Sequence, residues 1–281
     1  MSILGRIVIL RRAMLGLRTL RSPPSGTVKG GIFAPMHIAD IVTSLERDGL
    51  FTGIRLPQQV VDDLHEFALK TPCYGNLSKR LPFLPQEYKD AQSGYPKPIL
   101  VGHYMDKIFD CPIVDKIKRD PLLVEIATRY LKTKACLINA RMWWSFRVED
   151  LDESVLTLAA QNLLHFDMDD WSSIKFFFYL TDVDVDSGPH VYLRRSHRRK
   201  RLRDQFTIFL GKPVSEVIDF YGRDNLVTIC GPAGFGFVED PFGFHMGTVT
   251  QKGPRLVLEI EYGISEMSRR HFRNLVEKDA A

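Results

Sequence analysis

The sequence predicts an α+β protein in which helices come first and an antiparallel series of strands follows. Up to about residue 134, apolar residues recur at the spacing of one helix face, as Val60, Val61, Leu64 and Phe67 do. From about residue 135, short β-branched or aromatic runs alternate with Gly, Pro and Asp signals. This order favours helices packed on a closed or doubled sheet.

The elements are expected in the following order. Helices are predicted within residues 37–70 and 111–133, where Pro121 suits a first helical turn. Residues 71–100 are rich in Pro, Gly, Tyr and Ser, so we expect a long irregular loop, either a lid over a site or a surface segment with aromatic anchors. Strands are predicted at 136–146, 157–169, 173–183, 190–195, 226–231, 234–240, 245–250 and 255–263, with a helical insertion at 204–223.

Composition predicts an ordinary globular chain. Of the 281 residues, 44% are hydrophobic and 26% charged, and no apolar run approaches the roughly 18 residues of a membrane-spanning helix. The four cysteines are scattered without a CxxC pair, which indicates reduced thiols and a cytoplasmic location and argues against a zinc site. We expect a basic extension over residues 1–39 and a single domain over 40–281, with a helical part at 40–134 and a strand part at 135–265.

Positive charge is concentrated in two places. The first 39 residues hold six Lys or Arg and no acid, and "RRSHRRKRLR" (194–203) holds seven Lys or Arg in ten positions. The second cluster is either a solvated basic face or a site for phosphates, anionic lipid or nucleic acid. For the N-terminus three interpretations stay open: a helix on an anionic membrane, an organellar transit peptide, or an extension packed on the domain.

The stretch "NLLHFDMDDW" (162–171) places His165 and Asp167 on the same side of a predicted strand, although a loop with ordinary acids would also fit. A second histidine, His245, follows a predicted strand, and Arg255 lies ten residues further on. The turn signal "TQKGP" between them predicts neighbouring strands of one hairpin. Two histidines and one carboxylate form a facial triad, the ligand set that suits Fe(II) and leaves open positions for oxygen chemistry.

Two predicted strands would also turn charged residues inward. In "RLVLEIEYG" (255–263) the face of Leu256 suits helix packing, whereas Arg255 and Glu259 share the opposite face. An inward arginine needs an anion, supplied either by Glu259 or by a ligand. On "LINARMWWS", Arg141 shares a face with Trp143, so it would contact a ligand or lie on the surface of an edge strand.

Together, His165-x-Asp167, His245 and Arg255 resemble the Fe(II)/2-oxoglutarate-dependent oxygenases, and more narrowly the phytanoyl-CoA dioxygenase-like family. The segment "YLTDVDVDSGPHVYLRRSH" (179–197) is similar to the family's acidic turn, strand and "PGSH" end, and "RDGLF" and "RDPLLVEIATRYL" are similar to its helical half. The resemblance covers roughly residues 40–265. It implies a double-stranded β-helix (jelly-roll, cupin-like) core with helices packed on one sheet.

The resemblance also implies the chemistry. His165, Asp167 and His245 would hold Fe(II), 2-oxoglutarate would chelate the iron with its far carboxylate on Arg255, and O2 would be the oxidant. The expected reaction is hydroxylation of an unactivated C–H bond of a small-molecule or lipid-linked substrate, with release of succinate and CO2. No acid or base is assigned beyond the iron centre.

The chain departs from the family pattern at two places. Arg194 and Arg195 replace the usual Pro-Gly, and Gly247 stands where a hydroxyl residue is common, so Thr248 and Arg141 become candidate second contacts to 2-oxoglutarate. Lys175 is a weaker candidate, and His190 and His197 are expected to be structural.

Two other functions stay open. One is a non-catalytic cupin-like barrel that binds a metal or ligand. The other is a basic protein that binds a membrane through residues 1–21 or binds nucleic acid. This function ranks last because no aromatic-interleaved motif accompanies the basic clusters.

Overall fold

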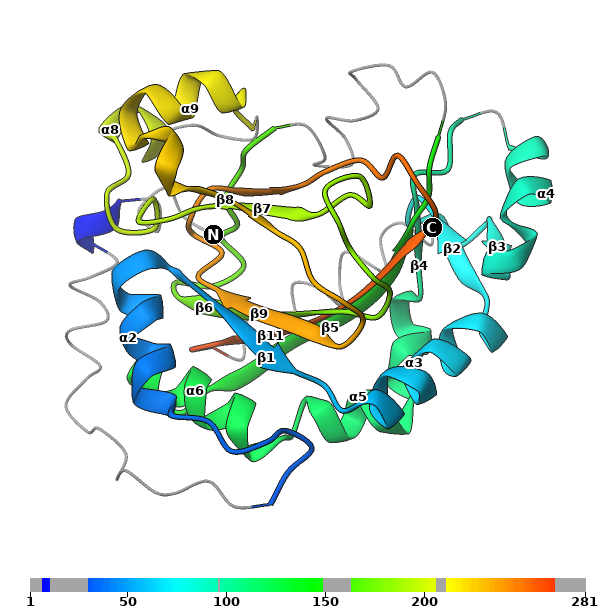
Figure 1. The fold of residues 1–281 in the computed structure, drawn as a ribbon, viewed down its shortest axis with the longest axis horizontal. Helices are drawn as coiled ribbons and strands as arrows, with labels where there is room; N and C mark the ends of the chain where they lie inside the picture. Colours follow the sequence, from blue (N-terminus) through cyan, green and yellow to red (C-terminus); the bar gives the residue numbers. More distant parts are fainter. Residues whose placement is uncertain (1–6, 11–29, 96, 149–162, 206–210, 266–281) are drawn as a thin grey trace.

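The computed structural model describes residues 7–10, 30–95, 97–148, 163–205 and 211–265. Within these residues the strands form two antiparallel sheets, so the predicted α+β layout is confirmed (Figure 1). The large sheet has the order β1-β9-β6-β11-β5-β4-β2-β3 and the small sheet the order β10-β7-β8. The strands are β1 (Leu50–Arg55), β2 (Cys73–Gly75), β3 (Pro82–Phe83), β4 (Val101–His103), β5 (Cys136–Ser145), β6 (Ser173–Tyr179), β7 (His190–Leu193), β8 (Leu226–Ile229), β9 (Phe235–Glu239), β10 (His245–Gly247) and β11 (Arg255–Gly263).

Helices cover one face of the large sheet. Among them are α2 (Ile38–Asp48), α3 (Gln58–Lys70), α5 (Pro112–Ile117) and α6 (Pro121–Leu131). The side chain of Asp120 caps α6 by accepting a hydrogen bond from the backbone N–H of Leu122 (2.9 Å), and Gly49 ends α2 in the left-handed region that favours glycine. Their apolar faces pack on the predicted side of β11, which presents Leu256, Leu258, Ile260 and Tyr262. This helix-covered layer is the main core.

The opposite face of the large sheet meets the small sheet. Between them lies a second apolar cluster that includes Phe177 and Tyr179 of β6, Tyr192 of β7 and Phe237 of β9. Beyond the small sheet, α9 (Val214–Tyr221) packs its buried Val217 on the outer side, in the region of the predicted insertion. The layers are therefore helices, large sheet, small sheet and an outer helix. None of the described helices has the length and hydropathy needed to cross a bilayer.

The predicted hairpin between His245 and Arg255 is wrong. Strand β10 pairs with β7 in the small sheet, whereas β11 pairs with β5 and β6 in the large sheet. The connecting segment crosses from one sheet to the other, and Thr248 is held on the way by its backbone hydrogen bond to the carbonyl of Pro189 (3.1 Å). A turn signal shows where a chain reverses, but pairing also depends on partners far away in the sequence.

The expectation of an irregular loop at residues 71–100 is also wrong. This region forms β2, β3, a 3₁₀ turn η2 (Pro85–Glu87) and α4 (Tyr88–Ser93), and with β4 it extends the large sheet beyond β5. Its strands are two or three residues long, too short to show a period in the sequence. The rings of Phe83 and Tyr88 pack on Phe146 in the helix-side core, which favours the anchor interpretation over the lid.

Candidate metal centre

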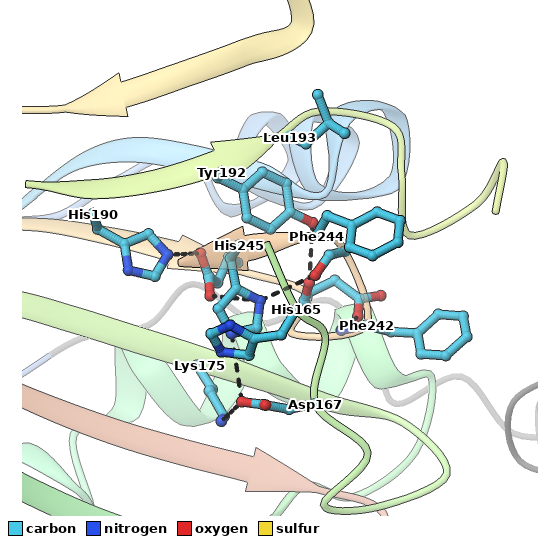
Figure 2. A network of polar contacts seen from close by, with 12 residues as sticks. His165, Asp167, Lys175, His190, Tyr192, Leu193, Phe242, Phe244 and His245 are labelled. Carbon is cyan, nitrogen blue, oxygen red and sulfur yellow. Dashed lines mark hydrogen bonds and ion pairs between the residues drawn. The ribbon is translucent and has the colours of Figure 1, made fainter. Parts of the chain in front are cut away.

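The structure brings His165, Asp167 and His245 together at the edge of the small sheet. His165 and His245 exchange backbone hydrogen bonds of 2.9 and 2.8 Å, which extends the small sheet by one isolated bridge. The backbone N–H of Asp167 donates to the carbonyl of Pro241 (2.8 Å), so the carboxylate is held beside the second histidine. One ligand atom from each side chain lies within 4.8 Å of the other two, and Figure 2 shows the three groups pointing toward one another.

The protonation of the two imidazoles suits a metal. Each Nδ1 lies near a backbone carbonyl, at 3.1 Å from Leu163 for His165 and at 3.0 Å from Gly243 for His245. Because a carbonyl only accepts hydrogen bonds, Nδ1 carries a proton in both rings, so the neutral form of each ring presents the lone pair of Nε2 to a metal. Burial lowers the pKa of His165 to about 4, which keeps that ring neutral. The donor set of two imidazoles and a carboxylate therefore fits Fe(II).

The electrostatic environment of the site attracts a cation. Burial opposes ionisation of Asp167, but the charge of Lys175 and the interactions with His245 together outweigh it and hold the pKa of the carboxyl well below its usual value. Burial would likewise lower the pKa of His245, yet the carboxylates of Glu239 and Asp167 raise it above the ordinary value. In the absence of a metal, this cluster of carboxylates stabilises positive charge on its neighbours.

Lys175 lies deeper in the site than the sequence suggested. It is a buried residue of β6, and its ammonium lies 2.5 Å from a carboxylate oxygen of Asp167 and 3.1 Å from one of Asp169 (Figure 2). A lysine in the middle of the strand "SIKFFFY" can be buried only with anionic partners. The free-energy cost of burying this lysine can be recognised in the sequence, and it indicates an acidic site facing β6.

His190 packs against the ring of His245. Its Nε2 lies 2.9 Å from the buried carboxylate of Glu239, and its ring stacks on that of His245 with centroids 5.6 Å apart (Figure 2). The expectation of a structural role for His190 is compatible with this place next to a candidate ligand. His197 is also buried, away from the triad. Its ring and Tyr192 lie so close to Gly49 that a β-carbon at that position would contact both.

The inner face of the large sheet orders its polar residues in cross-strand rows. Going from the triad end toward the start of β11, the successive rows are Glu239-Lys175-Glu261-Asn139, then Phe237-Phe177-Glu259-Arg141, then Tyr179-Val257-Trp143-His103, and finally Arg255-Ser145. Ionisable groups therefore lie in the rows at both ends, and the two rows between them combine aromatic rings with the Glu259–Arg141 ion pair. Glu261 is fully buried, and burial holds its pKa well above the usual value.

Arg255 is a buried arginine whose guanidinium has no carboxylate within ion-pair distance among the described residues. Among the described residues, a terminal nitrogen of this guanidinium donates a hydrogen bond to the hydroxyl of Ser145 (3.0 Å), and burial lowers the pKa of Arg255. Glu259, the alternative partner proposed from the sequence, instead pairs with Arg141 at 2.6 Å. A buried guanidinium in this state has the capacity to bind an external carboxylate in a bidentate manner.

The two weaker cosubstrate candidates lie in different surroundings. Arg141 is on β5, between β11 and β4, so it is not on an edge strand, and it faces the same interior as Trp143. The hydroxyl of Thr248 donates to the carbonyl of Pro189 (2.7 Å) on the segment that crosses between the sheets. Thr248 therefore helps to hold that crossing, and its hydroxyl proton is already used.

A feature that the sequence did not suggest is the burial of Lys200, which belongs to the basic run 194–203. Its ammonium lies over three phenylalanine rings, at 3.8 Å from the centroid of Phe166, 3.9 Å from Phe244 and 4.7 Å from Phe242. Phe166 separates the first two triad residues, and Phe244 precedes His245. Lys200 thus links the two segments that supply the triad through cation–π contacts.

Comparisons with known proteins identify a shared fold but no family. No protein-family model matches the chain, and no curated protein matches it significantly. Solved structures do match. The non-heme, α-ketoglutarate-dependent epimerase SnoN of nogalamycin biosynthesis has a TM-score of 0.56 at 13% identity, over 80% of this chain and 82% of SnoN.

Two further structures agree. HygX from Streptomyces hygroscopicus, with nickel and 2-oxoglutarate bound, has a TM-score of 0.53 at 14% identity, over 81% of this chain and 87% of HygX. The α-ketoglutarate-dependent carbocyclase SnoK has a TM-score of 0.53 at 14% identity, over 82% of this chain and 86% of SnoK. The chain has the fold of 2-oxoglutarate-dependent non-heme iron enzymes. The predicted cofactors agree with the ligands of these structures, while their activities differ from one another.

Proposed function

We propose that the protein is an Fe(II)/2-oxoglutarate-dependent oxygenase whose metal ligands are His165, Asp167 and His245. The observation that carries the proposal is the convergence of these three ligand atoms within 4.8 Å in a fold shared with such enzymes. The buried Arg255 supports it, because a dicarboxylate cosubstrate would supply the anion that the guanidinium lacks.

The chain's own residues have distinct tasks in this proposal. The carbonyls of Leu163 and Gly243 orient the imidazoles, and Arg255 with Ser145 binds the far carboxylate of 2-oxoglutarate. The bound iron would supply the oxidative chemistry, in which 2-oxoglutarate and O2 yield succinate, CO2 and an oxidised substrate. The aromatic row between Arg255 and the triad would exclude water around the cosubstrate.

We further propose hydroxylation of an unactivated C–H bond as the reaction, on a small-molecule substrate that is anionic or lipid-linked. The resemblance of the sequence to the phytanoyl-CoA dioxygenase-like family and the two facing sheets, as in a jelly-roll, support this finer assignment. Product mass tests it, because hydroxylation adds one oxygen atom, whereas the carbocyclase and epimerase chemistries named for SnoK and SnoN would not.

Anaerobic titration of the metal-free protein with Fe(II) and 2-oxoglutarate tests the site, with the visible charge-transfer band of the chelate as readout. We expect Asp167→Ala to abolish the band and Arg255→Ala to require at least about tenfold more 2-oxoglutarate, because a buried charged contact is lost. Arg223→Ala, at an exposed position, is the matched control. Folded protein that shows no band would overturn the oxygenase proposal.

A non-catalytic barrel is the second candidate function. The ion pair of Lys175 with Asp167 favours it, since an ammonium already occupies one carboxylate oxygen where a metal would bind. The chelate band and succinate release separate the two functions: a barrel in which Lys175 keeps its ion pair with Asp167 would give neither the band nor succinate.

A further inference from the structure

One corner of the molecule gathers segments that are far apart in the sequence. The backbone N–H of Val8 donates to the side chain of Gln205 on α8 (Leu202–Gln205) at 2.9 Å, which places residues 7–10 beside that helix. The guanidinium of Arg198 donates to the carbonyl of Glu46 near the end of α2, and Arg201 lies over the ring of Phe220 on α9. Figure 1 shows α8, α9, the short N-terminal helix and the end of α2 in this corner.

The corner is unusually apolar for a surface. Of the eight large hydrophobic side chains that are exposed in the described part of the chain, four lie here: Ile9 (74% exposed), Leu202 (71%), Phe220 (55%) and Leu10 (37%). They come from three separate elements, so their exposure is not the effect of one frayed helix. Exposed apolar groups gathered in one place mark a surface that contacts something apolar.

The same corner carries an arginine groove, defined here by its lining residues Arg47, Arg195, Arg198 and Arg199 with Thr43 and Glu46. The groove has a volume of about 530 Å³. Its acids are already matched, because Asp48 pairs with Arg47 and Arg195, and Glu46 pairs with Lys132. The groove therefore has a net positive charge, and planar guanidinium groups suit phosphate oxygens.

The backbone at Arg195 gives the groove its shape. This residue has a φ of 67°, which lies in the left-handed region and is uncommon for a residue with a side chain. Its N–H donates to the carbonyl of Asp48 (2.8 Å), so the arginine run is fixed against the end of α2. The cationic groups are thus displayed from a rigid support.

We propose that this corner is a docking surface for an anionic lipid bilayer. The exposed apolar side chains would enter the boundary between headgroups and acyl chains, while the arginine groove would bind lipid phosphates. Exposed leucine and isoleucine distinguish a bilayer from nucleic acid, which offers them no apolar partner. The sequence that continues from Leu10 adds Arg11, Arg12, Arg18, Arg21 and Lys29 and no acid up to residue 39, which increases the attraction to an anionic surface. This proposal does not depend on the chemistry of the metal centre.

Vesicle sedimentation with the full chain tests the proposal. We expect binding to phosphatidylcholine vesicles that contain about one third phosphatidylserine, weak binding to pure phosphatidylcholine, and release at high salt. The triple variant Arg195→Gln, Arg198→Gln, Arg199→Gln should lower the partition coefficient by about 100-fold, since each cation near such a surface contributes roughly fivefold. The variant Lys107→Gln, Lys116→Gln, Arg119→Gln removes equal charge from exposed positions near α5 and should bind as the wild type does.

A second variant separates apolar insertion from charge alone. Leu202→Gln with Phe220→Gln leaves the charge unchanged and should weaken vesicle binding, whereas Leu77→Gln with Phe109→Gln, at other exposed positions, should not. Binding driven by charge alone would leave both variants equal to the wild type. Thermal unfolding of each variant verifies that it is folded. The proposal is overturned if wild-type protein ignores anionic vesicles, if the arginine variant binds them as tightly as the wild type, or if duplex DNA or inorganic phosphate binds while vesicles do not.

Discussion

At the scale of single residues, the site depends on charged side chains whose burial is permitted by a specific partner. Lys175 is buried against two carboxylates and Lys200 against three aromatic rings, while the half-buried Arg141 pairs with the buried Glu259. Arg255 differs because, among the residues that the structure describes, it faces a hydroxyl and no carboxylate. This difference makes Arg255 the best candidate for a ligand contact.

Lys200 offers a test of how the triad is positioned. We expect Lys200→Met to weaken metal binding by about tenfold, because loss of the cation releases the rings of Phe166 and Phe244, which flank the ligands. Lys200→Arg keeps a cation over the rings and should restore most of the affinity. Calorimetry with Ni(II) is the measurement. The variant Arg199→Met, at the exposed neighbouring position, is the control.

Equal affinity of Lys200→Met and wild type for Ni(II) would show that the cation–π contacts stabilise the fold without affecting the ligands. The charge-transfer band of the Fe(II)–2-oxoglutarate chelate gives a second readout, because a displaced ligand changes its position as well as its intensity.

At the scale of elements, α8 is attached to the small sheet by a buried ionic network. Asp204 is fully buried and pairs with Arg201 at 2.7 Å and with Lys212 at 2.8 Å. Lys212 in turn exchanges backbone hydrogen bonds of 2.7 and 2.9 Å with Leu164, next to His165. The predicted insertion is therefore connected to the segment that supplies the first triad histidine.

Asp204→Ala should lower the free energy of unfolding by about 3 kcal/mol at pH 7, since it removes the carboxylate that Arg201 pairs with, while Lys212 keeps its ion pair with Glu216. Burial opposes ionisation of this carboxyl, but Arg201 and Lys212 outweigh it and hold its pKa below the ordinary value of 3.8. A lowered pKa contributes stability that is present above the ordinary value and is lost as the pH falls through the folded value.

The difference between Asp204→Ala and wild type should accordingly be constant from about pH 5 to 8 and shrink below about pH 4. Urea unfolding at several pH values measures it. Asp219→Ala, which removes an exposed acid of α9, should change stability by less than about 0.5 kcal/mol. A pH-independent difference would mean that Asp204 acts through packing instead of its charge.

At the scale of the whole molecule, the main apolar core lies on the helix side, while the space between the two sheets holds both an apolar cluster and buried ionisable groups. Near the triad, the carboxyl groups of Asp167, Asp169, Glu239, Glu259 and Glu261 outnumber Lys175 and Arg141, the lysine and arginine that pair with them, and His190 is a further partner of Glu239. Surplus buried carboxyl groups are destabilising without a further cation. Metal and cosubstrate should therefore stabilise the entire fold.

Ni(II) with 2-oxoglutarate, each at about a hundred times its dissociation constant, should raise the melting temperature by roughly 5 to 10 °C, because ligand binding of that strength adds about 2.7 kcal/mol or more to a domain of this size. Differential scanning fluorimetry with and without EDTA measures the shift. Asp167→Ala should lose the shift, whereas Arg255→Ala should keep the part due to metal. An unchanged melting temperature in wild-type protein would contradict a metal site at the triad.

Local patterns in the sequence were sufficient for α2, α3, α5, α6 and α9, for most strands and for the inward face of β11, whereas α4 lies where a loop was expected. Periodicity is a property of neighbouring residues, and the core side of each element follows from it. The convergence of His165, Asp167 and His245 was also expected, although their role as metal ligands stays a prediction. Spacing and side-chain chemistry are both visible in a linear sequence.

The long-range pairing was not accessible in the same way. Whether β10 joins β11 or β7, whether Glu259 pairs with Arg255 or Arg141, and where Lys200 is buried all depend on residues brought together from distant parts of the chain. The short strands β2 and β3 exist because β4, which is itself paired with β5, offers backbone partners to β2. Sheet register and buried charge pairs are settled by the free energy of the folded whole, because an ion or a strand edge is stable only once its partner is in place.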